Sequence, residues 1–246
     1  MTTDTTEENN TLTLYVKYKN EFETAIKDIQ NIIGGGENPG KKCAQMRKYL
    51  NFITPCQDIG RYLIEIKELY NHDSLKRCKY LNYRINSDEK YYNSSWFQGY
   101  KDFSSQIENI CIKEIKNIPE YSLENLKKLY GYYDDFSKFK GKDKDSDGHI
   151  CKSVTECHEI YMNNYQECQN KSNDSFCEEL INFKNAYDYK MNNFTPCNGL
   201  PLTLPQIEKT STQILSPEEE VDYLFVPILT TAIVLLMSFT TFFLYK

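Results

Sequence analysis

Residues 14–33 read LYVKYKNEFETAIKDIQNII, and their apolar side chains recur in steps of three and four. The repeating positions are Tyr15, Tyr18, Phe22, Ile26, Ile29 and Ile33. Because an α-helix turns once every 3.6 residues, this spacing places them on one helix face. The segment GGGENPG at 34–40 predicts the end of that helix, since glycine and proline interrupt helical backbone.

The same spacing continues along the chain in seven further stretches. They cover 43–53, 59–69, 75–85, 103–115, 126–136, 154–161 and 176–187. Thr54-Pro55 is expected to end the first of these helices, and the polar region 86–95 is expected to be a turn. Ser122 is a candidate N-cap. No stretch shows the sustained period-two alternation of a strand, so we predict an all-α, multi-helix, cysteine-containing ectodomain.

Residues 224–245 read LFVPILTTAIVLLMSFTTFFLY and carry no charge. At about 1.5 Å of rise per residue a helix of this length reaches roughly 33 Å, enough to cross the hydrocarbon core of a bilayer. We therefore predict one C-terminal transmembrane helix at 223–245, running from Leu224 to Tyr245. Lys246 after this helix favours a cytosolic C-terminus, because basic residues concentrate on that side.

The remaining segments differ in composition. We expect a disordered polar N-terminus at 1–11, a helical domain at 12–197, a Pro/Thr-rich stalk at 198–222 and a truncated cytosolic tail at 246. The first residues, MTTDTTEENNTLTL, lack the apolar core of a signal peptide. Export would therefore use the transmembrane span as a late signal or follow an unconventional route.

The charge balance restricts the class of partner. The formal net charge is −6, which argues against a nucleic-acid partner because phosphate binding needs a basic face. Tyrosine is abundant, with 20 residues against one tryptophan. Tyrosine suits half-buried helix faces and contact surfaces, although an A/T-rich genome would produce the same bias.

Cysteine usage leaves two alternatives open. No C-x-x-C spacing occurs, which argues against zinc ribbons and thioredoxin-like sites. Cysteines on apolar helix faces act as small hydrophobic residues if free, or as disulfide bridges in an oxidising compartment. Their density favours bridges for some pairs, and an odd count leaves at least one thiol unpaired within the chain. The nine are Cys43, Cys56, Cys78, Cys111, Cys151, Cys157, Cys168, Cys177 and Cys197.

One motif resembles a calcium-binding loop. Asp143, Asp145, Asp147 and Gly148 match positions 1, 3, 5 and 6 of an EF-hand. Val154 occupies position 12, where that loop needs a bidentate glutamate. We therefore predict no metal site, and these three aspartates remain a weak candidate calcium loop beside the simpler interpretation of a solvated acidic loop.

No arrangement for catalysis is visible. The sequence lacks G-x-S-x-G and a phosphate-binding glycine loop after a strand. Cys157 and His158 are adjacent, so on a helix their side chains diverge by about 100°. We expect no enzymatic activity, no cofactor and no small-molecule substrate.

Three features resemble the variant proteins of malaria parasites known as the vir type of the Plasmodium interspersed repeat superfamily. The motif Cys78-Lys-Tyr-Leu-Asn-Tyr-Arg-Ile-Asn86 is similar to a helix of that family, with Arg84 in place of its usual tryptophan. A second feature is the series of cysteines from Cys151 to Cys197, interleaved with Tyr161, Leu180, Phe183 and Tyr187. The third is the layout of helical cysteine domain, stalk and late membrane span.

The resemblance implies a multigene variant antigen, exported to or displayed on the infected red cell. It would act by binding in immune evasion or adhesion, with membrane lipid and a host cell-surface receptor or antibodies as partners. Exposed loops such as 34–40, 86–95 and 140–150 could vary while core positions maintain the packing. The alternative is an internal parasite membrane protein that scaffolds trafficking or organelle contacts.

Overall fold

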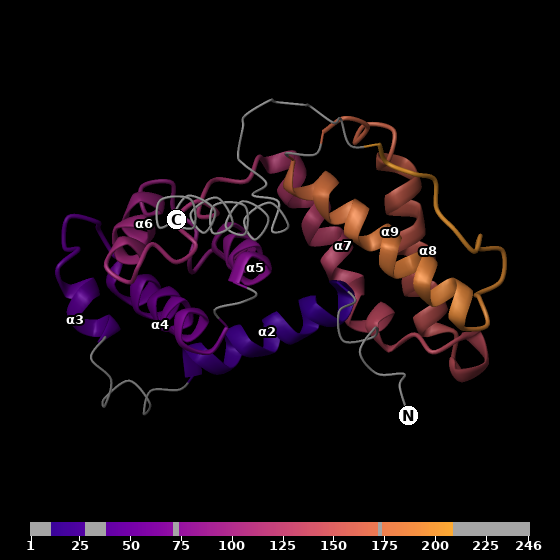
Figure 1. Cartoon of the computed structure of the whole chain (residues 1–246), viewed down its shortest axis with the longest axis horizontal. Helices are drawn as coiled ribbons and strands as arrows, with labels where there is room; N and C mark the ends of the chain where they lie inside the picture. Colours follow the sequence, from indigo (N-terminus) through magenta and orange to yellow (C-terminus); the bar gives the residue numbers. More distant parts are fainter. Residues whose placement is uncertain (1–10, 28–37, 71–73, 172–173, 209–246) are drawn as a thin grey trace, which may run out of the picture. The chain divides into compact units, whose positions relative to one another are not determined.

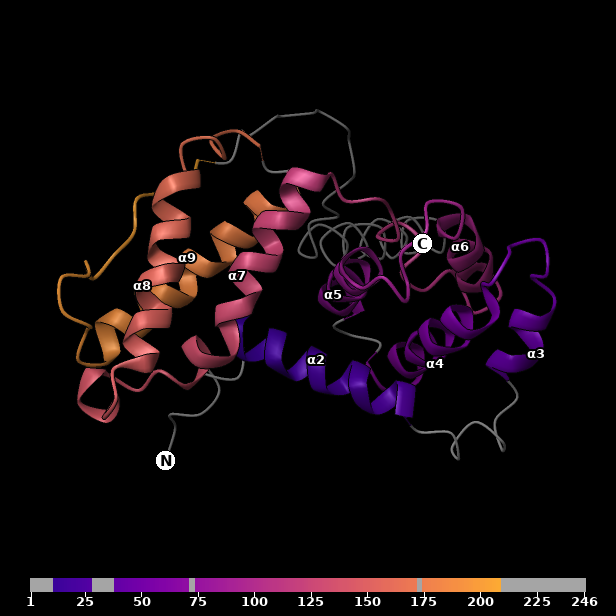
Figure 2. The same ribbon diagram turned by 180° about the vertical axis from the view of Figure 1, so that it is seen from behind.

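The computed structural model describes residues 11–27, 38–70, 74–171 and 174–208. The chain divides into two units, Met1–Thr210 and Ser211–Lys246, and all described residues belong to the first. The helices are α2 (Thr11–Lys27), α3 (Pro39–Ala44), α4 (Ile53–Leu69), α5 (Ser74–Ser87), α6 (Phe97–Ser105), α7 (Glu120–Lys138), η2 (Lys142–Lys144), α8 (His149–Asn164) and α9 (Ser175–Asn193) (Figures 1 and 2). These ranges contain helices and no strand, which confirms the all-α prediction for this part of the chain.

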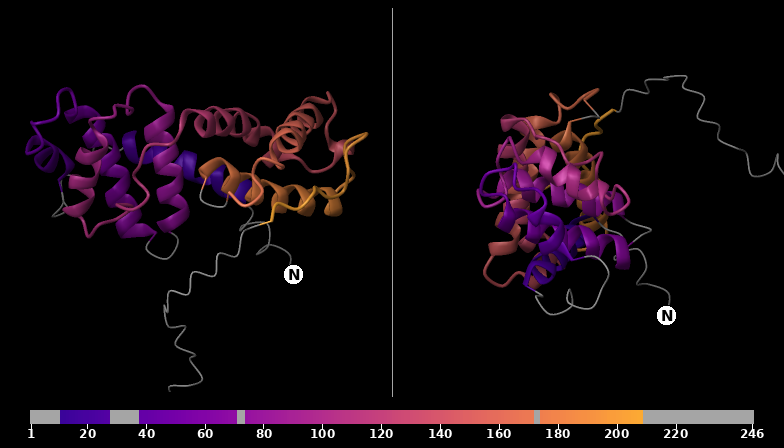
Figure 3. Two further views of the ribbon diagram at one scale, coloured as in Figure 1. Left: turned by 90° about the horizontal axis from the view of Figure 1, so that it is seen from above. Right: turned by 90° about the vertical axis from the view of Figure 1, so that its left-hand side faces the viewer.

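The buried side chains form two cores. The first core is built from α2, α3, α4, α5, α6 and the segment up to Ile115. The second is built from α7, α8, α9 and the extended segment up to Ile207. Helix α2 contacts α4 and α5 of the first group and α7 and α9 of the second, and it passes from one group to the other in Figure 3. Tyr15 and Tyr83 pack against both cores, so the two groups share an aromatic boundary.

The predicted helix at 43–53 is wrong. Helix α3 ends at Ala44, and a series of turns carries the chain to the start of α4 at Ile53. Asn51 has a φ of 57°, which no α-helix contains. Leu50, expected on the buried face, is 82% exposed. Pro55 does not end a helix, contrary to the expectation from the sequence. It lies in the first turn of α4, where a missing N–H leaves no intrahelical hydrogen bond unmade.

The predicted helix at 103–115 is also wrong. Helix α6 ends at Ser105, and turns follow up to residue 114. Positive φ values at Glu108, Asn109 and Cys111 exclude a continuous helix. The Ser104 hydroxyl donates a hydrogen bond of 2.6 Å to the carbonyl of Ile110, which stabilises the turn.

Two glycines offer a matched test of the packing. A Cβ atom on Gly60 of α4 would lie 2.5 Å from Cζ of the buried Phe103, whereas one on Gly131 of α7 would meet nothing within 4 Å. Gly60→Ala is therefore expected to lower the free energy of unfolding by about 1–3 kcal/mol, through overpacking. Gly131→Ala should raise it by about 0.5–1 kcal/mol, because alanine favours helical backbone. Chemical denaturation would measure both values, and a neutral Gly60→Ala would contradict the α4–α6 contact.

Candidate functional site

The structure pairs eight of the nine cysteines. The bridges are Cys43–Cys56, Cys78–Cys111, Cys151–Cys197 and Cys168–Cys177. Their Cα–Cα distances, 5.8, 5.0, 5.6 and 5.2 Å, are ordinary for disulfides. The first two lie in the first core and the last two in the second, so each helical group has its own pair of covalent links.

Cys157 is the free cysteine and is fully buried on α8. Burial raises the pKa of its thiol, and the charge of Glu156 adds to this effect. A thiol in this state packs as a small hydrophobic side chain. The neighbouring His158 lies 6.2 Å from the Tyr187 ring, between centroids, and partial burial lowers the pKa of its imidazole.

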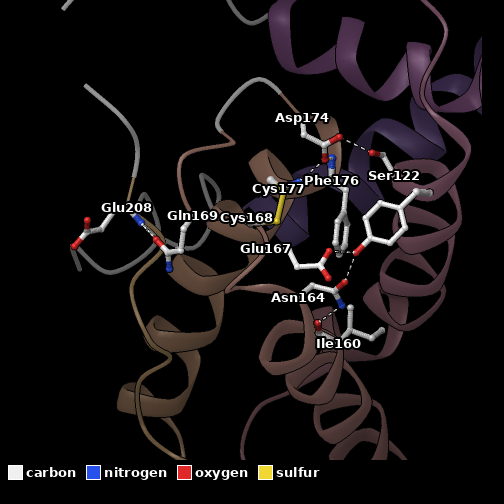
Figure 4. Close-up of a disulfide and its surroundings, with 11 residues drawn as sticks. Ser122, Ile160, Asn164, Glu167, Cys168, Gln169, Asp174, Phe176, Cys177 and Glu208 are labelled. Carbon is white, nitrogen blue, oxygen red and sulfur yellow. Dashed lines mark hydrogen bonds between the residues drawn. A yellow bond between two sulfur atoms is a disulfide. The ribbon is translucent and has the colours of Figure 1, made fainter. Parts of the chain in front are cut away.

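The Cys168–Cys177 bridge links the turns that follow α8 to the first turn of α9 (Figure 4). Asp174 caps α9 by accepting hydrogen bonds from the N–H groups of Phe176 and Cys177. Its other carboxylate oxygen accepts a hydrogen bond from the Ser122 hydroxyl. Ser122 is thus not the N-cap of its own helix, because α7 begins two residues earlier, at Glu120. The same hydroxyl instead fastens α7 to α9.

Two asparagines in the 78–86 motif hold the chain that leads to α7. Asn82 and Asn86 are buried on α5. Asn82 Oδ1 accepts a hydrogen bond of 2.9 Å from the Lys116 N–H, and Asn86 Oδ1 accepts one of 2.9 Å from the Ile118 N–H. Asn86 also donates to the Lys116 carbonyl at 3.0 Å. The side-chain amides of the motif therefore hold the backbone of the segment that connects the two helical groups.

The loop that carries Asp143, Asp145 and Asp147 provides hydrogen-bond acceptors for the first N–H groups of α8. Asp145 accepts hydrogen bonds from the N–H groups of Ile150 and Cys151, at 3.2 and 2.7 Å. Asp147 accepts a hydrogen bond from the His149 N–H. This bond is the main reason why the pKa of the Asp147 carboxyl is lowered. Asp143 is exposed in η2. In the part of the chain that the structure describes, no three metal-ligating side chains gather at one point.

A cavity with tyrosine walls is the most distinctive site that sequence patterns did not predict. It has a volume of about 60 Å³ and lies where α2, α5, α7 and α9 meet. We call it the tyrosine cavity, and its lining is Tyr15, Tyr18, Lys76, Lys79, Tyr80, Tyr130, Glu179 and Asn182. The Tyr15 and Tyr130 rings stack with centroids 4.3 Å apart, and the Tyr15 and Tyr80 rings meet edge to face at 5.6 Å.

Glu179 is a buried carboxyl beside this cavity. The Tyr133 hydroxyl donates to its Oε1 at 2.9 Å, and the Asn182 amide donates to its Oε2 at 3.2 Å. Burial raises the pKa of Glu179 from 4.5 to about 7, against the lowering effect of the hydrogen bonds from Asn182 and Tyr133. A second cavity of about 60 Å³ shares Lys79, Tyr130, Glu179 and Asn182 with the first, so Glu179 lines both.

Comparisons with protein-family models, curated proteins and solved structures find no match for this chain. The predicted transmembrane helix at 223–245, with Leu224 and Tyr245, lies outside the described residues. Among the helices that the structure does describe, none combines the length and the apolar character needed to cross a bilayer.

The raised pKa of Glu179 predicts that stability falls as pH rises from about 4.5 to about 7. Below pH about 4.5 the Glu179 carboxyl is neutral in both the folded and the unfolded chain. Between the two pKa values the unfolded chain has lost this proton while the folded chain still holds it, which favours unfolding. The free energy of unfolding should fall by about 3 kcal/mol across this window, since each pKa unit corresponds to about 1.4 kcal/mol. Glu179→Gln should remove this slope in urea denaturation, whereas Glu178→Gln, one residue away and half-buried, should retain it. An equal slope in Glu179→Gln and the natural chain would contradict the assignment.

Proposed function

We propose that this chain is a membrane-anchored variant antigen of the Plasmodium interspersed repeat type, exported to or displayed on the infected red cell. In this proposal it acts by binding, in immune evasion or adhesion, and residues 223–245 are its transmembrane anchor. The observation that carries the proposal is a helical domain with four disulfides, Cys43–Cys56 to Cys168–Cys177, ahead of an uncharged apolar run. Disulfides persist in oxidising compartments, which favours an extracytosolic position for the domain.

The surface of the domain is consistent with this role. In the segment 86–95, the side chains of residues 89, 90 and 92–95 are exposed, while Tyr91 is buried in the first core. Substitutions at the exposed positions would change what a receptor or antibody touches and leave the anchoring tyrosine in place. Tyr92 and Tyr121 are 44% and 55% exposed, and tyrosine is frequent among the residues that dominate binding energy.

Counting thiols would separate this proposal from an internal scaffolding role. The full chain is isolated from infected cells, denatured without reduction and alkylated, and its intact mass is measured by mass spectrometry. An extracytosolic domain is expected to carry one label, on Cys157, because the other eight cysteines are bridged. Nine labels would indicate a reducing compartment and would support the internal alternative.

Protease treatment of intact infected cells gives an independent test. Digestion of the domain while a cytosolic marker stays whole would support display at the surface. Full protection of the domain, with digestion after the membrane is permeabilised, would support an internal location. Extraction in alkaline carbonate tests the anchor, because an integral membrane protein stays in the pellet and a peripheral one is released.

A further inference from the structure

Positive charge is concentrated at one end of the first helical group. The whole chain has 35 acidic and 29 basic residues, yet residues 38–57 and 91–101 contain five basic residues and no acidic one. The two segments lie against each other, since the Trp96 indole bonds to the Leu50 carbonyl and α4 packs on α6. Figures 1 and 2 show them around α3 and α6. We call these two segments the basic tip, and its basic residues are Lys41, Lys42, Arg47, Lys48 and Lys101.

Much of the positive charge of the basic tip faces solvent. Lys41 and Arg47 are exposed, and neither makes an ion pair with another residue that the structure describes. Lys48 pairs with Asp102 at 3.0 Å, yet its side chain is 66% exposed. The tip thus presents a positive surface on a chain whose formal net charge is −6, and such a surface attracts an anionic partner.

Large apolar side chains are exposed on the same tip. Leu50 is 82% exposed, Ile53 is 45% exposed and Tyr92 is 44% exposed. The half-buried Phe97 meets Tyr92 edge to face, with ring centroids 6.1 Å apart. A single exposed apolar residue is ordinary in a soluble domain. Several of them on two adjoining segments that are rich in basic residues indicate a contact surface.

The structure fixes the turn from which Leu50 protrudes. The Cys43–Cys56 bridge closes the segment that carries it. Asn51 reverses the chain with a φ of 57°, a left-handed conformation in which asparagine is enriched. The Trp96 indole N–H donates a hydrogen bond of 3.0 Å to the Leu50 carbonyl. An apolar residue that is positioned in advance loses little backbone freedom when it binds.

We propose that the basic tip inserts Leu50 into an anionic lipid bilayer, with Lys41 and Arg47 against the lipid headgroups. A fluid bilayer suits a protruding apolar side chain because it yields to the protrusion and needs no complementary recess. Lysine and arginine are attracted to anionic headgroups, and aromatic rings such as those of Tyr92 and Trp96 favour interfacial depth.

This contact is peripheral and involves no chemical step. It is separate from the proposed anchor at 223–245 and adds a second attachment to lipid. It rests on the described residues of the basic tip, so it stands whether the protein is displayed on the infected cell or lies inside the parasite.

Vesicle binding by the full chain would test the proposal. The chain is reconstituted into nanodiscs of phosphatidylcholine, and the discs are mixed with large vesicles that are then sedimented. Vesicles of phosphatidylcholine that contain about one third phosphatidylserine should bind the discs at least about tenfold more tightly than vesicles of phosphatidylcholine alone, because only the former attract basic residues. Empty discs are the control and should bind neither.

Trp96 reports whether the basic tip makes the contact. It is the single tryptophan of the chain, so with a tryptophan-free disc scaffold all tryptophan fluorescence comes from the tip. Vesicles that carry a spin-labelled lipid should quench this fluorescence on binding. Binding without quenching would place the contact elsewhere on the chain and overturn the proposal.

Two variants separate insertion from attraction by charge. Leu50→Ser should weaken binding to the anionic vesicles about tenfold through loss of apolar contact, and Arg47→Gln about fivefold through loss of one charge near the headgroups. The matched controls are Leu202→Ser, 50% exposed on the segment after α9, and Lys128→Gln, exposed on α7. Both controls should change binding less than about twofold, since they lie outside the tip. Leu50 and Arg47 are exposed, so neither substitution should unfold the domain.

Two results overturn the proposal. One is equal binding of the discs to anionic and neutral vesicles. The other is unchanged binding of Leu50→Ser, which would leave attraction by charge alone, as expected of a surface for a soluble polyanion. Entry of the chain into the discs is scored separately, because it tests the proposed anchor. If the chain stays outside the discs, the anchor fails, and the same vesicle assay on the chain in solution still tests the basic tip.

Discussion

Replacing Arg77 with methionine is expected to lower the free energy of unfolding by about 3–5 kcal/mol. Arg77 on α5 makes a two-pronged ion pair with Glu21 on α2, at 2.8 Å from Nε and 3.1 Å from Nη2. The two side chains are only 4% and 11% exposed. The guanidinium also lies 3.7 Å from the Tyr70 ring centroid. Without Arg77, the Glu21 carboxylate would remain buried and lose its bidentate partner, and this desolvated charge is the main source of the cost.

The double variant Arg77→Met/Glu21→Gln separates the ion pair from the packing. It should recover much of the loss in urea denaturation, because it removes the uncompensated charge as well. A pair on the surface serves as the reference: Lys127 and Glu124 are 41% and 56% exposed, so Lys127→Met should cost less than about 0.5 kcal/mol. If the double variant is as unstable as Arg77→Met alone, lost stacking on Tyr70 and not the stranded charge explains the effect.

Helical spacing predicted elements well where one face of the helix meets the core without interruption. Helices α4 and α9 follow the predicted stripes at 59–69 and 176–187, although both begin earlier than the stripes do. The stripe at 103–115 failed because turns can bury residues at the same spacing. Phe103, Ile107 and Ile115 are all buried, yet Ile107 and Ile115 lie outside any helix. The spacing of apolar residues thus predicts which side chains face the core, but it does not determine the backbone conformation between them.

The candidate site was harder to predict because its parts come from separate helices. Disulfide pairing depends on which helices pack together, so the nine cysteines alone did not determine it. Glu179 appears in the sequence as one of two glutamates in Phe176-Cys-Glu-Glu-Leu180. Its spacing of three and four from the buried Phe176 and Phe183 was the available signal, since it places the carboxyl on the apolar face. The compensating hydroxyl of Tyr133 comes from α7 and is visible only in the fold.

Removing the Cys151–Cys197 bridge with two alanines is expected to lower the free energy of unfolding by about 4 kcal/mol. The bridge closes a loop of sequence separation 46, and a longer loop restricts the unfolded chain more. The same replacement at Cys168 and Cys177, whose separation is 9, should cost about 2.5 kcal/mol. Denaturation in guanidinium under non-reducing conditions would compare the two variants while the other bridges stay closed.

The order of these two costs tests how the bridges act. Without Cys151–Cys197, the extended segment after α9 still has native hydrogen bonds: Tyr187 donates to the Pro201 carbonyl at 2.8 Å, and the Leu204 N–H donates to Asp188 at 2.9 Å. The folded state should therefore keep its shape, and the loss should come from the freedom that the unfolded chain gains. A larger cost for the short Cys168–Cys177 loop would mean that native contacts around Asp174 outweigh chain entropy. The bridge shown in Figure 4 would then be the principal support of the second core.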